Sequence, residues 1–164
     1  MRFILSFLFF LLLTATAEAA TFWVTPDGAG NCFNSISDPG ATLSTNSINQ
    51  GLTCMGSGDT LYIKAGTYFD VIESARGKDG ACQFRGGRPC IPNGTSSAWT
   101  KIYAAPEHER KVIVNGSANT PLAIWGPNKF IEIKGIKFTP DRMNAGGATT
   151  SKATQGDCEF PDFT

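Results

Sequence analysis

The chain has 164 residues, with 14 basic and 14 acidic side chains and a formal net charge of zero. Only 17% of the residues are charged, so neither a nucleic acid nor an anionic membrane surface is indicated as a partner. The 18 glycines and 9 prolines, with many Ser, Thr and Asn residues, are typical of a turn-rich β protein.

Residues 1–19 are predicted to be a cleaved signal peptide. Arg2 precedes an apolar run, residues 3–13, that is too short to span a bilayer. Residues 17–19, Ala-Glu-Ala, have the small side chains of a cleavage site, and an uncleaved anchor is the alternative. We expect a secreted or periplasmic mature chain that starts near Ala20, with about 145 residues for one domain.

A pattern of strand, glycine bend and strand recurs along the chain. It begins at Gly66, where Leu61 and Ile63 of the preceding strand share one face, and it returns at Gly116 and Gly135. Glycine accepts a tight corner without a steric clash. The approximate repeat of roughly 25 residues suggests a solenoid, with an insertion between the first two bends as one possibility. On this pattern alone, a β-sandwich with irregular loops is the alternative.

Residues 20–58 are expected to form an N-terminal cap. A solenoid needs its open end covered. Residues 43–52 are predicted to form a short helix that does this, anchored by Leu43, Ile48 and Leu52.

Beyond the cap, the strands alternate apolar and polar residues, as strands with one buried face do. The inward side chains are expected to be Ile102, Val112, Val114, Leu122, Ile124, Ile131, Ile133, Ile136 and Phe138. Asn115 fits either a ladder of stacked Asn side chains or an ordinary Asn-Gly turn. His108 lies in a polar turn and is predicted to be a surface residue, not a catalytic base.

Five cysteines follow the signal peptide. Secretion favours disulfides, and the absence of a CxxC spacing argues against zinc. The expected pairs are Cys32–Cys54 and Cys82–Cys90, each stabilising a loop by about 2–4 kcal/mol. Cys158 is left over. We expect it to pair with a residue beyond the end of this sequence, and a free thiol is the alternative.

The closest family resemblance lies at residues 59–68, Asp-Thr-Leu-Tyr-Ile-Lys-Ala-Gly-Thr-Tyr. They resemble the GDTVYVKAGTY opening of secreted right-handed parallel β-helix proteins of the pectate-lyase-like superfamily. Residues 22–28 resemble the family's first strand, and residues 112–117 its VVIDGS strand, so the resemblance covers roughly residues 21–139. It implies an all-β fold, a right-handed parallel β-helix with an N-terminal cap and about three coils over residues 59–164.

Residues 73–98 interrupt the repeat as an insertion. Insertions in solenoids often line the binding side. The segment is either a basic surface that recognises an acidic sugar or a solvent-exposed loop closed by a disulfide, and we expect the latter. Asn93 and Asn115 begin glycosylation sequons. The basic residues of the insertion are Arg76, Lys78, Arg85 and Arg88.

After Thr139 the regular pattern fades. Asp157, Glu159 and Asp162 surround Cys158 and are of the type that binds Ca²⁺. The spacing matches neither an EF-hand nor a nonapeptide calcium repeat, so we assign no metal ligand here and expect Ca²⁺ only as a cofactor of a longer protein.

The resemblance also implies activity on carbohydrate. Lyases of the family cleave acidic polysaccharides by β-elimination, using Ca²⁺ or a basic side chain to neutralise the uronate and a Lys or Arg base. Its hydrolases use carboxylate pairs. These groups lie on middle coils of longer helices, so no catalytic residue is assigned in this chain. By position alone the nearest candidates are Lys134, Lys137, Asp141 and Arg142.

Three interpretations follow. The favoured one is the N-terminal fragment of a secreted polysaccharide lyase that is inactive by itself. The second is a non-catalytic β-helix surface protein, such as an adhesin or a carbohydrate-binding module, because one fold hosts both. The third is a complete small secreted protein in which Cys158 forms an intermolecular disulfide. In the first two the expected partner is a polysaccharide, acidic if the lyase prediction holds, and the chain is expected to be a monomer.

Overall fold

The computed structural model describes residues 18–74, 89–116, 121–124 and 129–139. Within these residues the regular structure is mainly β, with a 3₁₀ helix η1 (Ala41–Leu43) and one α-helix, α1 (Ile48–Cys54). The expectation of a β protein is confirmed at this level. The strands are β1 (Thr21–Val24), β2 (Thr60–Ile63), β3 (Gly66–Tyr68), β4 (Ile72–Glu73), β5 (Thr100–Ala104), β6 (Val112–Asn115), β7 (Leu122–Ala123), β8 (Ile131–Lys134) and β9 (Ile136–Thr139).

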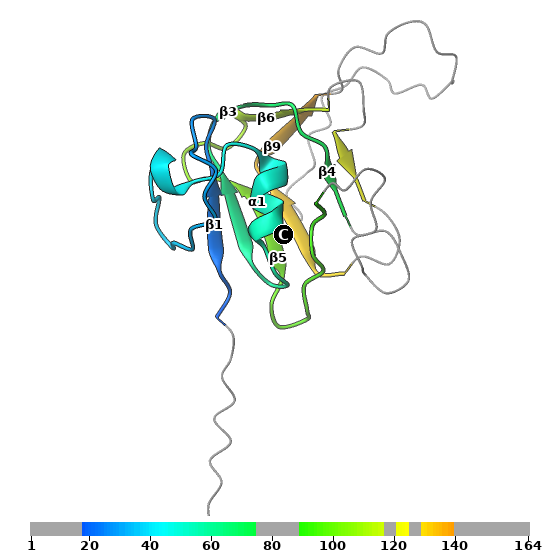
Figure 1. The fold of residues 1–164 in the computed structure, drawn as a ribbon. Coiled ribbons are helices and arrows are strands. Elements are labelled where there is room, and N and C mark those ends of the chain that lie inside the picture. Colours follow the sequence, from blue (N-terminus) through cyan, green and yellow to red (C-terminus); the bar gives the residue numbers. More distant parts are fainter. Residues whose placement is uncertain (1–17, 75–88, 117–120, 125–128, 140–164) are drawn as a thin grey trace, which may run out of the picture.

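The strands form three parallel sheets, which the chain visits in turn. The first has the order β1-β2-β5-β8, the second β3-β6-β9, and the third β4-β7 (Figure 1). Each return to the first sheet places the new strand beside the strand of the previous round. The sheets stay separate in the described residues, so parallel stacking is established and closure into a solenoid is not.

The spacing of the rounds varies from sheet to sheet. In the first sheet Thr60 lies opposite Lys101, and Lys101 opposite Glu132, so successive rounds are 41 and 31 residues apart. In the second sheet Gly66 lies opposite Val112, and Val112 opposite Ile136, so the rounds are 46 and 24 residues apart. The last of these matches the predicted period of roughly 25 residues, and the longer rounds contain additional connecting residues.

Two of the three predicted glycine bends join the first sheet to the second. Gly66 begins β3, and Gly135, with φ of 73°, joins β8 directly to β9. Gly116 does not form such a bend, because it follows β6 in the second sheet. The corresponding corner, residues 105–111, contains no glycine, and Glu107 and Arg110 adopt left-handed φ values of 68° and 61° there.

The predicted cap helix is present but starts later than expected. Ser47 caps α1 by accepting a hydrogen bond from Gln50 N at 3.1 Å. Ile48 and Leu52 are buried as predicted, whereas Leu43 is 37% exposed. The helix cannot include Leu43, because the backbone of Thr45 is extended beside β1: Thr45 N donates a hydrogen bond to Trp23 O, and Thr45 O accepts one from Thr25 N.

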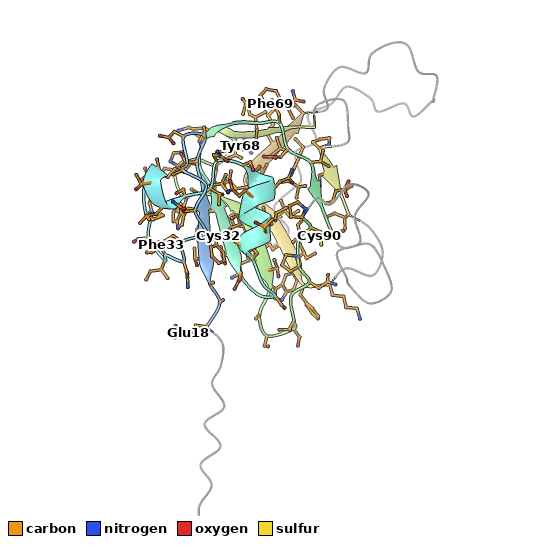
Figure 2. The ribbon with its side chains drawn as sticks, viewed as in Figure 1. Glu18, Cys32, Phe33, Tyr68, Phe69 and Cys90 are labelled. Atoms are coloured by element: carbon orange, nitrogen blue, oxygen red, sulfur yellow. A yellow bond between two sulfur atoms is a disulfide. The ribbon has the colours of Figure 1, made fainter. Side chains whose placement is uncertain are left out.

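A disulfide joins Cys32 to Cys54, as expected, with the Cα atoms 5.5 Å apart. It ties the segment after β1 to the end of α1. Cys90 is also disulfide-bonded (Cys32 and Cys90 are labelled in Figure 2). Its expected partner Cys82, and Cys158, lie outside the described residues.

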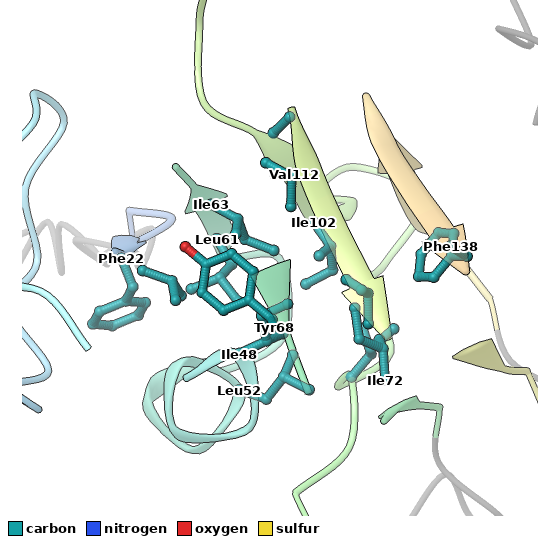
Figure 3. Packing of buried hydrophobic residues seen from close by; sticks show 14 residues of the cluster. Phe22, Ile48, Leu52, Leu61, Ile63, Tyr68, Ile72, Ile102, Val112 and Phe138 are labelled. Atoms are coloured by element: carbon teal, nitrogen blue, oxygen red, sulfur yellow. The ribbon is translucent and has the colours of Figure 1, made fainter. Parts of the chain in front are cut away.

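The core lies between the sheets and α1. Its members are buried apolar side chains that come from all three sheets and from the helix (Figure 3). Of the predicted inward residues, Ile124 is 53% exposed, because it follows the two-residue strand β7 and no longer alternates within a sheet. The others are buried or packed against the core, namely Ile102, Val112, Val114, Leu122, Ile131, Ile133, Ile136 and Phe138.

Candidate functional site

Aromatic side chains stack in register on the outer face of the first sheet. Tyr62 lies opposite Trp23 on one side and Tyr103 on the other, and the next residue in this row is Lys134. Ring centroids are 4.9 Å apart for Trp23 and Tyr62, and 6.1 Å apart for Tyr62 and Tyr103. Parallel strands bring equivalent side chains this close because they lie ~4.8 Å apart. We call Trp23, Tyr62 and Tyr103 the aromatic column.

The Trp23 end of the column is covered. Trp23 is only 6% exposed although it points away from the core. Its indole Nε1 donates a hydrogen bond to the carbonyl of Ser35 at 2.8 Å, and Ser35 N donates to Thr21 O at 2.8 Å. The Cys32–Cys54 disulfide fixes the start of this covering segment. A ligand therefore has no access to the indole.

The Tyr103 end of the column is open. Both faces of the Tyr62 ring have an aromatic neighbour, whereas Tyr103 is followed by Lys134 on β8. A recess of about 210 Å³ opens to solvent at this point. It is lined by Tyr62, Tyr103, Ala104, Pro106, Glu109 and Lys134.

Glu132 influences the titration of Tyr103. Partial burial, and then hydrogen bonding with Glu132 and the negative charge of that residue, raise the pKa of Tyr103 above its usual range. The phenol thus stays neutral beside the recess.

The corner of residues 105–111 forms one wall of the recess. His108 Nδ1 accepts a hydrogen bond from Ala65 N at 2.9 Å, which links two successive corners. Arg110 N donates to Gly135 O at 2.8 Å, and a Cβ at Gly135 would lie 3.2 Å from Glu109 Cγ. Glu109 is therefore set against the next corner. His108 is partly buried in a turn whose neighbouring residues are exposed, and its ring has a structural partner that the sequence did not indicate.

The structure does not gather the candidate catalytic residues. Lys134 lies at the recess, but Lys137 lies on β9 of the second sheet, opposite Ile113. Asp141 and Arg142 lie outside the described residues. Asn115 faces Thr139 in the register, so this pair does not continue an Asn ladder.

The charged residues that were considered for sugar or Ca²⁺ binding and not assigned also lie outside the described part of the chain. They are the basic residues Arg76, Lys78, Arg85 and Arg88 and the acidic residues Asp157, Glu159 and Asp162. Within the described ranges, no three or more His, Cys, Asp or Glu side chains come together as a metal site. Likewise, no helix of those ranges is long and apolar enough to cross a membrane.

The sequence contained a signal for the aromatic column. Tyr62 and Tyr103 each alternate with buried residues of their strand, which predicts an outward direction. The sequence does not connect Tyr62 with Tyr103, because their 41-residue spacing follows from the register of β2 and β5.

Comparisons of the chain with protein-family models, with curated proteins and with solved structures give no match. The resemblance at residues 59–68 therefore remains a resemblance of motifs.

Proposed function

We propose that the chain is part of a secreted right-handed parallel β-helix that binds polysaccharide on the outer face of its first sheet. The observation that carries this proposal is the aromatic column with its open end at Tyr103. An aromatic ring that is next to groups able to form hydrogen bonds is what recognition of a sugar ring requires, since sugars have apolar faces and polar rims.

The β-helix is supported by the order in which the chain visits the sheets. Three parallel sheets receive one strand each per round, from β2 to β3 to β4 and then from β5 to β6 to β7. Crossover connections between parallel strands of one sheet are almost always right-handed. Residues 59–68, which resemble the β-helix motif, form β2, the corner and β3 of this arrangement.

Secretion is supported by two features. The predicted signal peptide, residues 1–19, has the sequence pattern of an export signal. The disulfide of Cys32 with Cys54, and the bonded state of Cys90, fit a chain that folds in an oxidising compartment.

Cleavage by β-elimination stays a prediction from the resemblance. The recess offers Lys134 and Glu109 beside an aromatic ring, and this arrangement supports binding of a sugar. We therefore assign binding to the recess. A binding role is shared by the lyase interpretation and by the non-catalytic surface protein.

The test is binding of the secreted, oxidised chain to a panel of soluble polysaccharides in affinity electrophoresis. We expect Tyr103→Ala to weaken binding by about tenfold or more, equal to a loss of ~1.4 kcal/mol. Phe69→Ala is the matched control, because Phe69 is 68% exposed and follows β3 of the second sheet (Figure 2). Absence of binding to every polysaccharide, or equal losses in the two variants, would contradict the proposal.

A further inference from the structure

The charges on the outer face of the first sheet are balanced locally. Lys134 and Glu109 line the same recess. Lys101 lies opposite Glu132 in the register of β5 and β8. The face therefore presents no cluster of positive charge in the part of the chain that the structure describes.

A uronate would fit this balance poorly. A nearby cation stabilises the carboxylate of a bound uronate only when no anion is equally close, because the repulsion between like charges acts over the same distance. Lys134 and Glu109 both line the recess, and Glu132 acts electrostatically on Tyr103, so a carboxylate bound there has anionic as well as cationic neighbours. We expect the attraction and the repulsion to offset each other.

A neutral pyranose would use the same groups well. The Glu109 carboxylate accepts hydrogen bonds from sugar hydroxyls, and the Lys134 ammonium donates to them. The apolar face of the ring can lie on Tyr103, and Pro106 offers an apolar edge.

We infer that the recess between Tyr103 and Lys134 binds a neutral pyranose unit of a polysaccharide in preference to a uronate. This inference rests on the proposed polysaccharide-binding function and names its substrate class. It departs from the acidic substrate that the family resemblance implies.

The experiment compares neutral chains, a β-glucan, a xylan and a galactan, with polygalacturonate, using titration calorimetry at about 0.05 and 0.5 M NaCl. We expect at least one neutral chain to bind about tenfold or more tightly than polygalacturonate, with little change in affinity between the two salt concentrations. Glu109→Gln should weaken binding of the neutral ligand several-fold and strengthen binding of polygalacturonate. Lys134→Met should also weaken binding of the neutral ligand.

Two results separate the inference from the proposed function. If polygalacturonate binds more tightly and loses affinity in salt, the neutral-sugar inference is overturned and polysaccharide binding stands. If no polysaccharide binds, the proposed function fails and the inference fails with it. If Phe69→Ala loses binding of the neutral polysaccharide and Lys134→Met does not, the binding site lies on another face and the inference is overturned.

Discussion

Gly28 is the position where a single methyl group should disturb the cap most. A Cβ there would lie 2.2 Å from the carbonyl oxygen of Thr45 and 2.8 Å from that of Ser44. These are backbone atoms, so no side-chain rotation relieves the contact. Thr25 N donates to Thr45 O at 2.9 Å, and Gly28 N donates to Thr25 O at 3.0 Å, which fixes the two segments together.

Relief of the Gly28→Ala clash requires a backbone shift of roughly 1 Å, because close carbon contacts lie near ~3.5 Å. A shift of that size breaks one or two of the local backbone hydrogen bonds, at ~1 kcal/mol each, and leaves buried groups without partners. We therefore expect Gly28→Ala to lower the free energy of unfolding by about 2–3 kcal/mol. For a chain of this size the melting temperature should fall by about 4–12 °C.

Urea and thermal unfolding of the oxidised chain measure the effect of Gly28→Ala. Gly56→Ala is the matched control, since the nearest atom to its added Cβ is Asp59 Oδ2 at 3.4 Å. That variant should stay within about 0.5 kcal/mol of wild type. Equal stability of the two variants would refute the close approach of the cap segments.

Three further changes test the cap, the corner and the acid response. Replacing Cys32 and Cys54 with Ala opens a 22-residue loop and should lower stability in urea by about 3 kcal/mol; a loss below about 1 kcal/mol would count against the constraint. His108→Ala removes the hydrogen-bond acceptor between two corners and should destabilise the protein by about 1 kcal/mol. His108→Asn keeps an acceptor near the position of Nδ1 and should recover part of that loss. Identical unfolding midpoints for the two variants would exclude the hydrogen bond. The hydrogen bond from Lys64 lowers the pKa of Asp38 below its ordinary value of 3.8, so this carboxylate contributes stability above that value and loses it as the pH falls through the lowered pKa. Asp38→Asn should weaken the pH dependence of the urea unfolding midpoint below about pH 4. The same pH dependence in the variant and the wild type would argue against the pair of Lys64 and Asp38.

The sequence predicted the strand–corner–strand units at Gly66 and Gly135 because their signals are local. Alternation in Leu61, Tyr62 and Ile63 determines which side chains enter the core, and Gly135 marks a corner with positive φ. The pair Cys32–Cys54 followed from proximity in the sequence.

Long-range features were not predictable in the same way. The corner between β5 and β6 contains no glycine. It is held to the neighbouring corners by His108 Nδ1, which accepts a hydrogen bond from Ala65 N, and by Arg110 N, which donates one to Gly135 O. The burial of Trp23 depends on Ser35, whose position is not encoded in any local pattern. The recess at Tyr103 requires the register of two rounds, which only the fold provides.

Amide chemical-shift mapping can locate a sugar bound at the open end of the aromatic column. An isotopically labelled, oxidised chain would be titrated with the oligosaccharide that matches the tightest polysaccharide. We predict that the perturbed amides cluster at Tyr62, Tyr103 and Lys134, and that Tyr103→Ala needs about tenfold more ligand, or a greater excess, for the same changes. Perturbations confined to the second sheet around Phe69, or to α1, would contradict the account.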